Sequence, residues 1–456
     1  MTMLILIALG ILFPITYITH MLASKAEAVL EPNKSESFHK LQQQFFIVYF
    51  PAAFSDWLQG PYTYQVYSNY GYTEPQIALL YVTGFFSSMV CGTGVGILAD
   101  KFGRKRLCIT YSFLYAISCI TKASPLYSIL IVGRILGGIC TSILFSTFEA
   151  WYVHQHSQKF HFPPQWINIT LAKATFYNGV LAICAGVVSN IAAEWAEWGP
   201  VSPFMIAVPF LLVSAFLTMF LWEENHIEPT CTVNYSCAAL KAIFRTQNKS
   251  LLCLGLVQSL FESVMYTFVF LWTPVLEPLR PPLGIIFSCF MLCIMIGSSI
   301  YSFLIARKYT AVHLLHMSFI IALVALVLLA GAMKMVTLYP QDTGEYTLVA
   351  FIAFLVYEIA VGIYFPAVGY LRSQIIPEQY RASISNWYRV PMNILTCLCL
   401  LWLKNIAHIG KEFAFDTAVS SFKAFSMCII LLSVAVKLCR LLKLDNENAK
   451  LIMEFI

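Results

Sequence analysis

Seven charged residues stand inside long apolar stretches of this sequence, where a charged side chain can bind an ion or carry a proton: Asp56, Arg134, Glu149, Lys173, Glu262, Glu358 and Arg389. In a membrane-spanning segment such a charge costs at least about 2.5–3.5 kcal/mol unless it is paired or hydrated. This cost makes each residue a candidate for a transport site. The alternative for each is an interhelical salt bridge that only orients helices.

Asp56 begins a polar stripe within an otherwise apolar and aromatic run. Asp56, Gln59, Gly60 and Thr63 are spaced i, i+3, i+4 and i+7, which places them on one face of a helix. We therefore expect the carboxylate of Asp56 to face a cavity or a partner rather than lipid. Glu262 lies about as far into its own apolar segment and predicts a similar environment.

Two bases and their neighbours one turn further on show the same correspondence between the two parts of the chain: Lys173 with Tyr177, and Arg389 with Asn393. Matching positions of this kind are typical of a parallel internal repeat, whose interface holds the substrate in many transporters. We expect these four residues to contact an anionic substrate, with the arginine suited to two oxygens at once.

The acids call for different roles because an ionised carboxylate repels an anion. For Asp56 and Glu262, pairing with the bases and carrying a coupling proton remain equally open, and Glu358 belongs to the same class. Arg134 and Glu149 are expected near the cytosolic end of their helix, where a salt bridge that orients helices is the favoured interpretation.

The composition predicts a membrane protein. Of 456 residues, 59% are hydrophobic and 11% charged, against about 25% charged in ordinary globular domains. The apolar residues form blocks about 20 residues long, enough to span a bilayer. Thirteen helices are expected, at about 1–22, 43–62, 76–98, 105–121, 125–147, 166–190, 201–222, 251–275, 283–305, 312–334, 346–369, 384–404 and 419–442. The first is expected to be a retained helix, with a cleaved signal peptide as the alternative.

The loops predict an orientation with the C-terminus in the cytosol. If the N-terminus lies outside, few bases remain in outside loops: Lys122, Arg280, Lys334, Lys404 and Lys411. The expected organisation is an extra N-terminal helix and loop (1–40), a six-helix half (41–222), a cytosolic linker (223–250), a second six-helix half (251–442) and a cytosolic tail (443–456). We expect a monomer embedded in the lipid bilayer.

No pattern in the sequence predicts catalysis or a cofactor. A phosphate-binding G-x-x-x-x-G-K-[ST] motif, Cys and His residues at zinc spacing and a recognisable nucleophilic triad are all absent from the sequence. The 14 cysteines lie mostly in apolar blocks. We therefore expect neither an enzyme, a metal centre nor a nucleic-acid-binding protein.

A short basic turn joins two apolar segments and carries the sharpest motif. Gly96, Asp100, Gly103 and Arg104 fit the pattern G-x-x-x-D-[RK]-x-G-R-[RK], which resembles the loop between the second and third core helices of the major facilitator superfamily. Arg134, with glycines three and four residues further on, resembles the R-x-x-x-G element of that superfamily. The resemblance implies an all-α, twelve-helix core of two six-helix halves, here with the extra N-terminal helix, and a conformational role for the basic loop.

Longer segments, among them FSDWLQGPYTYQVY and SNWYRVP, are similar to the molybdate-anion transporter subfamily from about Phe45 to Arg440. The resemblance implies uptake of molybdate, a tetrahedral oxyanion, across the cell membrane by alternating access. Two other functions remain open. One is proton-coupled transport of a small neutral solute, and the other is a membrane receptor of the same fold that does not transport.

Overall fold

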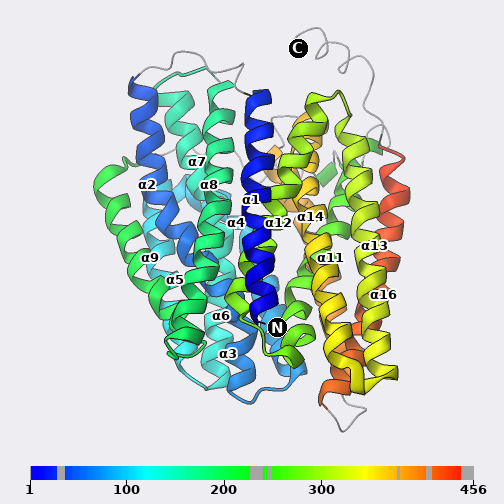
Figure 1. The fold of residues 1–456 in the computed structure, drawn as a ribbon. Helices are drawn as coiled ribbons and strands as arrows, with labels where there is room; N and C mark the ends of the chain where they lie inside the picture. Colours follow the sequence, from blue (N-terminus) through cyan, green and yellow to red (C-terminus); the bar gives the residue numbers. More distant parts are fainter. Residues whose placement is uncertain are drawn as a thin grey trace. The chain divides into compact units, whose positions relative to one another are not determined.

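The computed structural model describes residues 2–27, 36–163, 165–225, 240–241, 243–244, 249–376, 381–406 and 413–442. These residues are helical with short connections (Figure 1), and the described part contains no strand. The helices are α1 (Thr2–Glu27), α2 (Glu36–Gln59), α3 (Thr63–Asn69), α4 (Glu74–Phe102), α5 (Arg104–Ile120), α6 (Tyr127–Leu144), α7 (Thr147–His154), α8 (Gln165–Asn190), α9 (Ser202–Leu221), α11 (Lys249–Leu276), α12 (Leu283–Ala306), α13 (Ala311–Leu338), α14 (Thr343–Ile375), α15 (Arg381–Ile406) and α16 (Phe413–Cys439).

The chain forms two compact units. Unit 1 comprises Met1–Thr230, Leu279–Met295 and Leu400–His408, and unit 2 comprises Cys231–Pro278, Ile296–Cys399 and Ile409–Ile456. In unit 1, α2 packs against α8 and α9, α4 against α6, and α5 against α6 and α9. In unit 2, α13 packs against α14 and α16, and α11 packs against the same two helices. The cores of the units are thus helix-on-helix layers, as the all-α prediction required.

The thirteen predicted helices are all present, and two of them are interrupted. The segment predicted as 43–62 ends as α2 at Gln59, passes through a 3₁₀ turn, η2 (Gly60–Tyr62), and resumes as α3. The segment predicted as 125–147 divides into α6 and α7 around Phe145 and Ser146. Pro61 lacks a backbone N–H and favours the first break; nothing comparable in the sequence marks the second.

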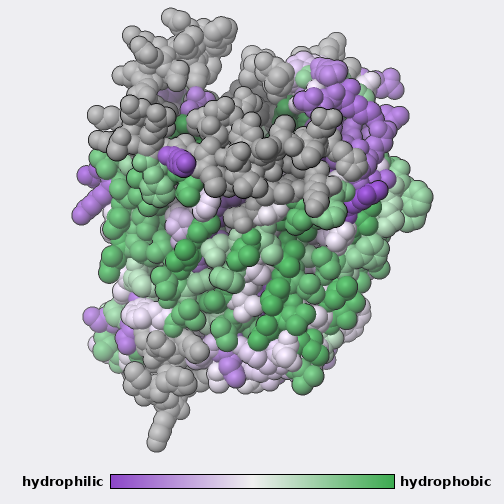
Figure 2. Space-filling model, turned by 180° about the vertical axis from the view of Figure 1, so that it is seen from behind, coloured by the Kyte–Doolittle hydropathy of each residue, from purple (hydrophilic) through white to green (hydrophobic). Residues whose placement is uncertain are grey.

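Hydrophobic side chains form a broad middle zone on the face that Figure 2 shows, and the most hydrophilic side chains lie above and below it. Nine helical segments within the described residues are long and apolar enough to cross a membrane, and α1 contributes a shorter apolar stretch, Ile5–Thr19. Small polar residues join neighbouring helices inside unit 1. The hydroxyl of Ser55 donates to the carbonyl oxygen of Ala207 at 3.2 Å, and that of Ser214 donates to Val48 at 3.0 Å. Such contacts are typical of helix packing in membranes, where backbone and hydroxyl groups must be satisfied internally.

The basic turn between α4 and α5 is held by a carboxylate that the sequence analysis did not include. The backbone N–H groups of Lys105 and Arg106 donate to the two carboxylate oxygens of Glu224 at 2.9 and 3.2 Å. Glu224 therefore caps the N-terminus of α5, where a negative charge is favoured by the helix dipole. Arg104 donates to the carbonyl oxygen of Ala150 in α7 at 2.8 Å. The surroundings of Gly96 and the side chain of Asp100 lie outside the described part.

Gly103 is required in this turn for two reasons, and we expect Gly103→Ala to lower the melting temperature. Its φ of +94° disfavours any residue with a β-carbon, and a β-carbon would lie 2.4 Å from the carboxyl carbon of Glu224. We expect a loss of about 1–3 kcal/mol in stability. The matched control is Gly94→Ala in α4, since a β-carbon at Gly94 meets nothing within 4 Å. Equal melting temperatures for the two purified variants would contradict this account.

Candidate functional site

Asp56 lies in α2 of unit 1 and is held by a tyrosine rather than by a base. The hydroxyl of Tyr115, in α5, donates a short hydrogen bond to the carboxylate of Asp56. Tyr115 is itself buried, and its ring lies 5.5 Å from that of Tyr111. Asp56 forms no ion pair with a described residue. The acid is therefore stabilised by a neutral donor, which leaves its charge uncompensated in the described surroundings.

The rest of the predicted polar stripe is used for local bonding. The side chains of Gln59 and Thr63 are buried and donate to the carbonyl oxygens of Ser55 and Gln59, at 3.1 and 2.8 Å. These bonds satisfy backbone groups at the end of α2, where the helix changes to η2. Within the stripe, Asp56 is the residue whose titratable side chain is hydrogen-bonded to another helix, α5.

Glu149 lies in α7 and Lys173 lies in α8, both in unit 1. Glu149 lies exposed in the first turn of α7, and its charge acts on the hydroxyl of Tyr49 in α2 together with that of Asp56. Lys173 is half-buried in α8. One turn further on, Tyr177 packs its ring against Phe50 at 5.7 Å. Tyr177 is 45% exposed.

Arg134 does not lie near the end of its helix at which it was predicted together with Glu149. It sits two turns into α6, where its guanidinium lies over the ring of Tyr81 at 4.8 Å and acts electrostatically on Lys122. Both neighbours belong to the end of unit 1 opposite the basic turn. The expectation that Arg134 and Glu149 lie near the same end of their helix was wrong, because α6 runs from the Lys122 end toward α7. Which end faces the cytosol stays a prediction.

Unit 2 contains the second predicted acid, Glu262, which has both a hydroxyl donor and bases near it. The hydroxyl of Tyr364, in α14, donates to the carboxylate of Glu262, in α11, at 3.1 Å. Arg372 and Arg389 both interact electrostatically with the same carboxylate, Arg372 more strongly. The three charges come from α11, α14 and α15, so this cluster joins three helices of one unit.

The backbone around Arg389 is fixed by the neighbouring Tyr388. The ring of Tyr388 lies against Gly255 of α11, where a β-carbon would come within 2.3 Å of a ring carbon. Its hydroxyl donates to the carbonyl oxygen of Leu251 at 2.5 Å, and Ser259 donates to the carbonyl oxygen of Tyr388 at 2.9 Å. These contacts hold α15 close to α11. Arg389 is left half-buried.

Asn393 and Glu358 are both buried in unit 2. Asn393 is 3% exposed and donates to the carbonyl oxygen of Arg389 at 2.8 Å, so one of its two N–H groups supports its own helix. Glu358 is 4% exposed in the middle of α14, and its carboxyl group forms no hydrogen bond or ion pair within the part of the chain that the structure describes. A carboxyl group without a partner in such surroundings is a candidate proton carrier, because the neutral form avoids the cost of a buried charge.

Two charged residues of these clusters, Arg372 and Lys122, were not predicted from the sequence. Both were assigned to loops, because each lies next to a helix end and a lysine or arginine there usually fixes orientation. The structure instead places Arg372 beside Glu262 and buries Lys122. A signal was available for Lys122, since it is the only charged residue in the short connection between two apolar segments at 105–121 and 125–147.

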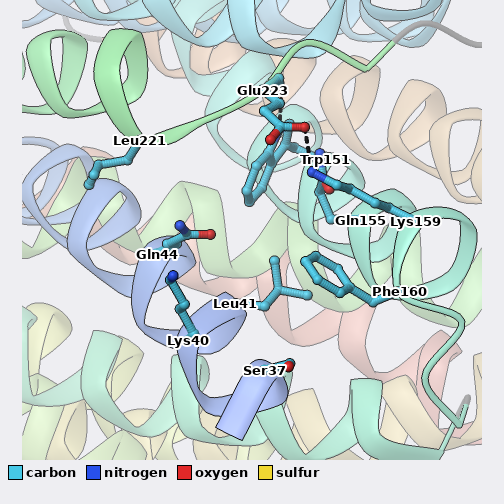
Figure 3. Close-up of a pocket in the computed structure, with 10 residues that line it drawn as sticks. All are labelled: Ser37, Lys40, Leu41, Gln44, Trp151, Gln155, Lys159, Phe160, Leu221 and Glu223. Atoms are coloured by element: carbon cyan, nitrogen blue, oxygen red, sulfur yellow. Dashed lines mark hydrogen bonds and ion pairs between the residues drawn. The ribbon is translucent and has the colours of Figure 1, made fainter.

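A cavity of about 310 Å³ opens in unit 1 where α2 begins and α9 ends (Figure 3). Its lining residues are Ser37, Lys40, Leu41, Gln44, Trp151, Gln155, Lys159, Phe160, Leu221 and Glu223. Lys159 is paired with Glu223, whereas Lys40 forms no ion pair with a described residue and extends beside Gln44. Trp151, one of these lining residues, stacks its ring on that of Trp222, with the ring centres 3.8 Å apart. This basic cavity can raise the local concentration of anions. Among the described residues, no group of three or more His, Cys, Asp and Glu side chains is arranged to hold a metal ion.

Comparison with known families decides the class of the protein. A family model described as sugar transporters with 12 transmembrane helices, from the major facilitator superfamily, matches residues 7–356. The chain belongs to the major facilitator superfamily. As a member, it is a multi-pass membrane transporter rather than an enzyme, which confirms the predicted class.

Two relatives in this superfamily are similar over most of the chain. The molybdate-anion transporter of Xenopus tropicalis is 39% identical over 411 residues, which are 90% of this chain and 88% of that protein. The molybdate-anion transporter of Takifugu rubripes is 39% identical over 422 residues, 88% of this chain and 86% of that protein. The predicted subfamily resemblance is confirmed.

Among solved structures, the nucleoside transporter NupG superposes with a TM-score of 0.65, covering 89% of this chain and 99% of its own. The sequence identity is 12%. The likeness therefore confirms the fold of a major facilitator transporter.

Proposed function

We propose that this protein transports molybdate, a tetrahedral oxyanion, across the cell membrane into the cytosol by alternating access. The observation that carries the proposal is the 39% identity with molybdate-anion transporters over 90% of the chain. The predicted loop charges support a cytosolic C-terminus. The proposed organisation is an extra N-terminal helix and loop (1–40), a six-helix half (41–222), a cytosolic linker (223–250), a second six-helix half (251–442) and a cytosolic tail (443–456). A monomer surrounded by lipid is sufficient for this mechanism.

The charge cluster in unit 2 supports an anionic substrate. Two arginines, Arg372 and Arg389, act on the single carboxylate of Glu262, so the cluster as a whole carries excess positive charge. A dianion with four oxygens can use that excess, and a guanidinium suits two of its oxygens. We propose Arg389 and Asn393 as substrate contacts from unit 2, and Lys173 and Tyr177 as substrate contacts from unit 1.

The proposal predicts saturable molybdate uptake by proteoliposomes that contain the purified protein. Excess sulfate, which has the same tetrahedral shape and charge, should inhibit this uptake, and protein-free liposomes should show none. The proposal would be contradicted if the protein took up no oxyanion but took up a neutral solute in response to an imposed proton gradient.

That outcome would favour the second candidate function, proton-coupled transport of a small neutral solute. The observations in its favour are the carboxyl groups of Asp56 and Glu358, neither of which has an ion-pair partner among the described residues. An arabinose-proton symporter from Bacillus subtilis is 30% identical over 131 residues, but these are only 28% of this chain. The non-transporting receptor remains the third proposal, and measured transport of either solute would exclude it.

A further inference from the structure

Lys122 is a buried lysine at the α3 end of unit 1. It lies in the 3₁₀ turn η3 (Thr121–Ala123) that follows α5, and it is 3% exposed. Its ammonium donates to the hydroxyl of Tyr67 at 2.9 Å and lies 5.2 Å from the centre of that ring. The hydroxyl of Tyr70 donates to the carbonyl oxygen of Lys122 at 2.6 Å, which fixes the backbone. The ammonium group is thus held in one place.

Arg134 is the second cation of this region, and its side chain is fixed equally well. Its Nε donates to the carbonyl oxygen of Leu80 at 3.1 Å, and its guanidinium lies over the ring of Tyr81. Gly84 leaves room for the group, since a β-carbon there would lie 2.9 Å from Nη2. The guanidinium therefore lies flat against α4.

The two cations have more hydrogen-bond donors than the protein uses. A lysine has three N–H donors and an arginine five, and each of these side chains makes one hydrogen bond with a described residue. Neither forms an ion pair there. Burial lowers the pKa of the Lys122 ammonium, the Tyr67 hydroxyl opposes that change, and the nearby Arg134 guanidinium lowers the pKa further. Two like charges thus stand together, and no acid among the described residues forms an ion pair with either of them.

We propose that Lys122 and Arg134 form an oxyanion-binding site, at which a tetrahedral anion accepts hydrogen bonds from the ammonium and from the terminal nitrogens of the guanidinium. The proposal rests on the proposed function, because it makes the same substrate class the ligand of this site. A purely structural role for Lys122, fastening η3 to Tyr67, needs one neutral hydrogen bond and gives no reason for a charge beside Arg134. In the predicted orientation the site lies at the outer end of unit 1, where a substrate for uptake arrives.

Equilibrium binding of radioactive molybdate and of radioactive sulfate to the purified full-length protein tests the site. Lys122→Met and Arg134→Gln should each raise the Kd for molybdate about tenfold to hundredfold, the loss expected for hydrogen bonds to a charged group. Gly84→Ala keeps both charges but displaces the guanidinium, so it should weaken binding less. The matched control is Lys334→Met, which removes an exposed lysine predicted on the same side of the membrane.

The outcomes separate this site from the function on which it rests. Wild-type affinity in Lys122→Met and Arg134→Gln, with unchanged melting temperatures, would overturn the site and leave molybdate transport standing. Sulfate binding that is lost in these variants, without any molybdate binding, would keep the site and overturn the proposed substrate. A wild-type protein that binds neither anion would overturn both. If Lys122→Met fails to fold, unchanged affinity in both Arg134→Gln and Gly84→Ala overturns the site.

Discussion

Arg389→Gln is expected to lower the rate of molybdate uptake at least about 100-fold at a fixed low molybdate concentration. The reason is the loss of two charge-assisted hydrogen bonds, each worth about 1.5–3 kcal/mol, and a total near 3 kcal/mol corresponds to about 100-fold. Glutamine keeps a polar side chain at this half-buried position in α15, but it is shorter than arginine and carries no charge. Uptake into proteoliposomes at equal protein density is the measurement.

Three further variants separate substrate contact from other effects. Arg307→Gln changes an exposed arginine of the same unit, whose guanidinium lies over Phe303, and should leave uptake unchanged. Arg389→Lys keeps the charge but loses the planar fork, so its loss should be smaller than that of glutamine. Arg372→Gln removes the stronger electrostatic partner of Glu262, so its uptake rate shows how far a change around that carboxylate alone affects transport. Wild-type uptake by a stable Arg389→Gln protein would remove Arg389 from the substrate site.

The helices were predictable because the signal for a spanning helix is carried by many residues at once. A block of about 20 apolar residues can satisfy its backbone groups in a bilayer only as a helix, whatever the rest of the chain does. The predicted segment 166–190 and the observed α8 (Gln165–Asn190) therefore agree to within a residue. The break between α6 and α7 was not predictable, because the sequence around Phe145 and Ser146 contains no glycine or proline.

The partners of the charges were harder to predict, because a partner is chosen by packing between helices that are distant in sequence. Asp56 and Tyr115 are bonded although 59 positions separate them, and Glu262 and Tyr364 although 102 separate them. Spacing along one helix shows which side of it is polar, but not which helix faces that side. For this reason Asp56 was predicted correctly to face a partner, while its tyrosine went unnoticed.

The different partners of the two acids suggest different roles for them. Glu262 lies near two arginines, so its charge has a place in an ionic cluster. Asp56 has a hydroxyl donor, and the described part of unit 1 offers it no ion pair. A carboxylate held by a hydroxyl alone can accept a proton without breaking an ion pair. Of the two roles left open by the sequence, the surroundings of Asp56 favour a proton carrier.

Asp56→Asn is therefore expected to lower transport at least about 100-fold and to abolish its response to an imposed proton gradient, while the protein remains folded. Asparagine fills the same space and still accepts a hydrogen bond from Tyr115, but it has no carboxyl group that could bind and release a proton. A positioned proton-transfer group typically contributes about 10²–10⁴ in rate. Uptake with and without a pH gradient, together with the melting temperature, is the measurement.

Tyr115→Phe is the matched variant, because it removes the hydroxyl donor but leaves the carboxyl group of Asp56 in place. A proton carrier predicts that this variant still responds to the gradient, at a reduced rate. A purely structural pair predicts instead that Tyr115→Phe loses more stability and transport than Asp56→Asn, because phenylalanine has no hydroxyl donor whereas asparagine can still accept the hydrogen bond. Transport that survives in Asp56→Asn with its gradient response intact would assign the proton to another group, and Glu358, buried without an ion-pair partner among the described residues, would be the next to replace.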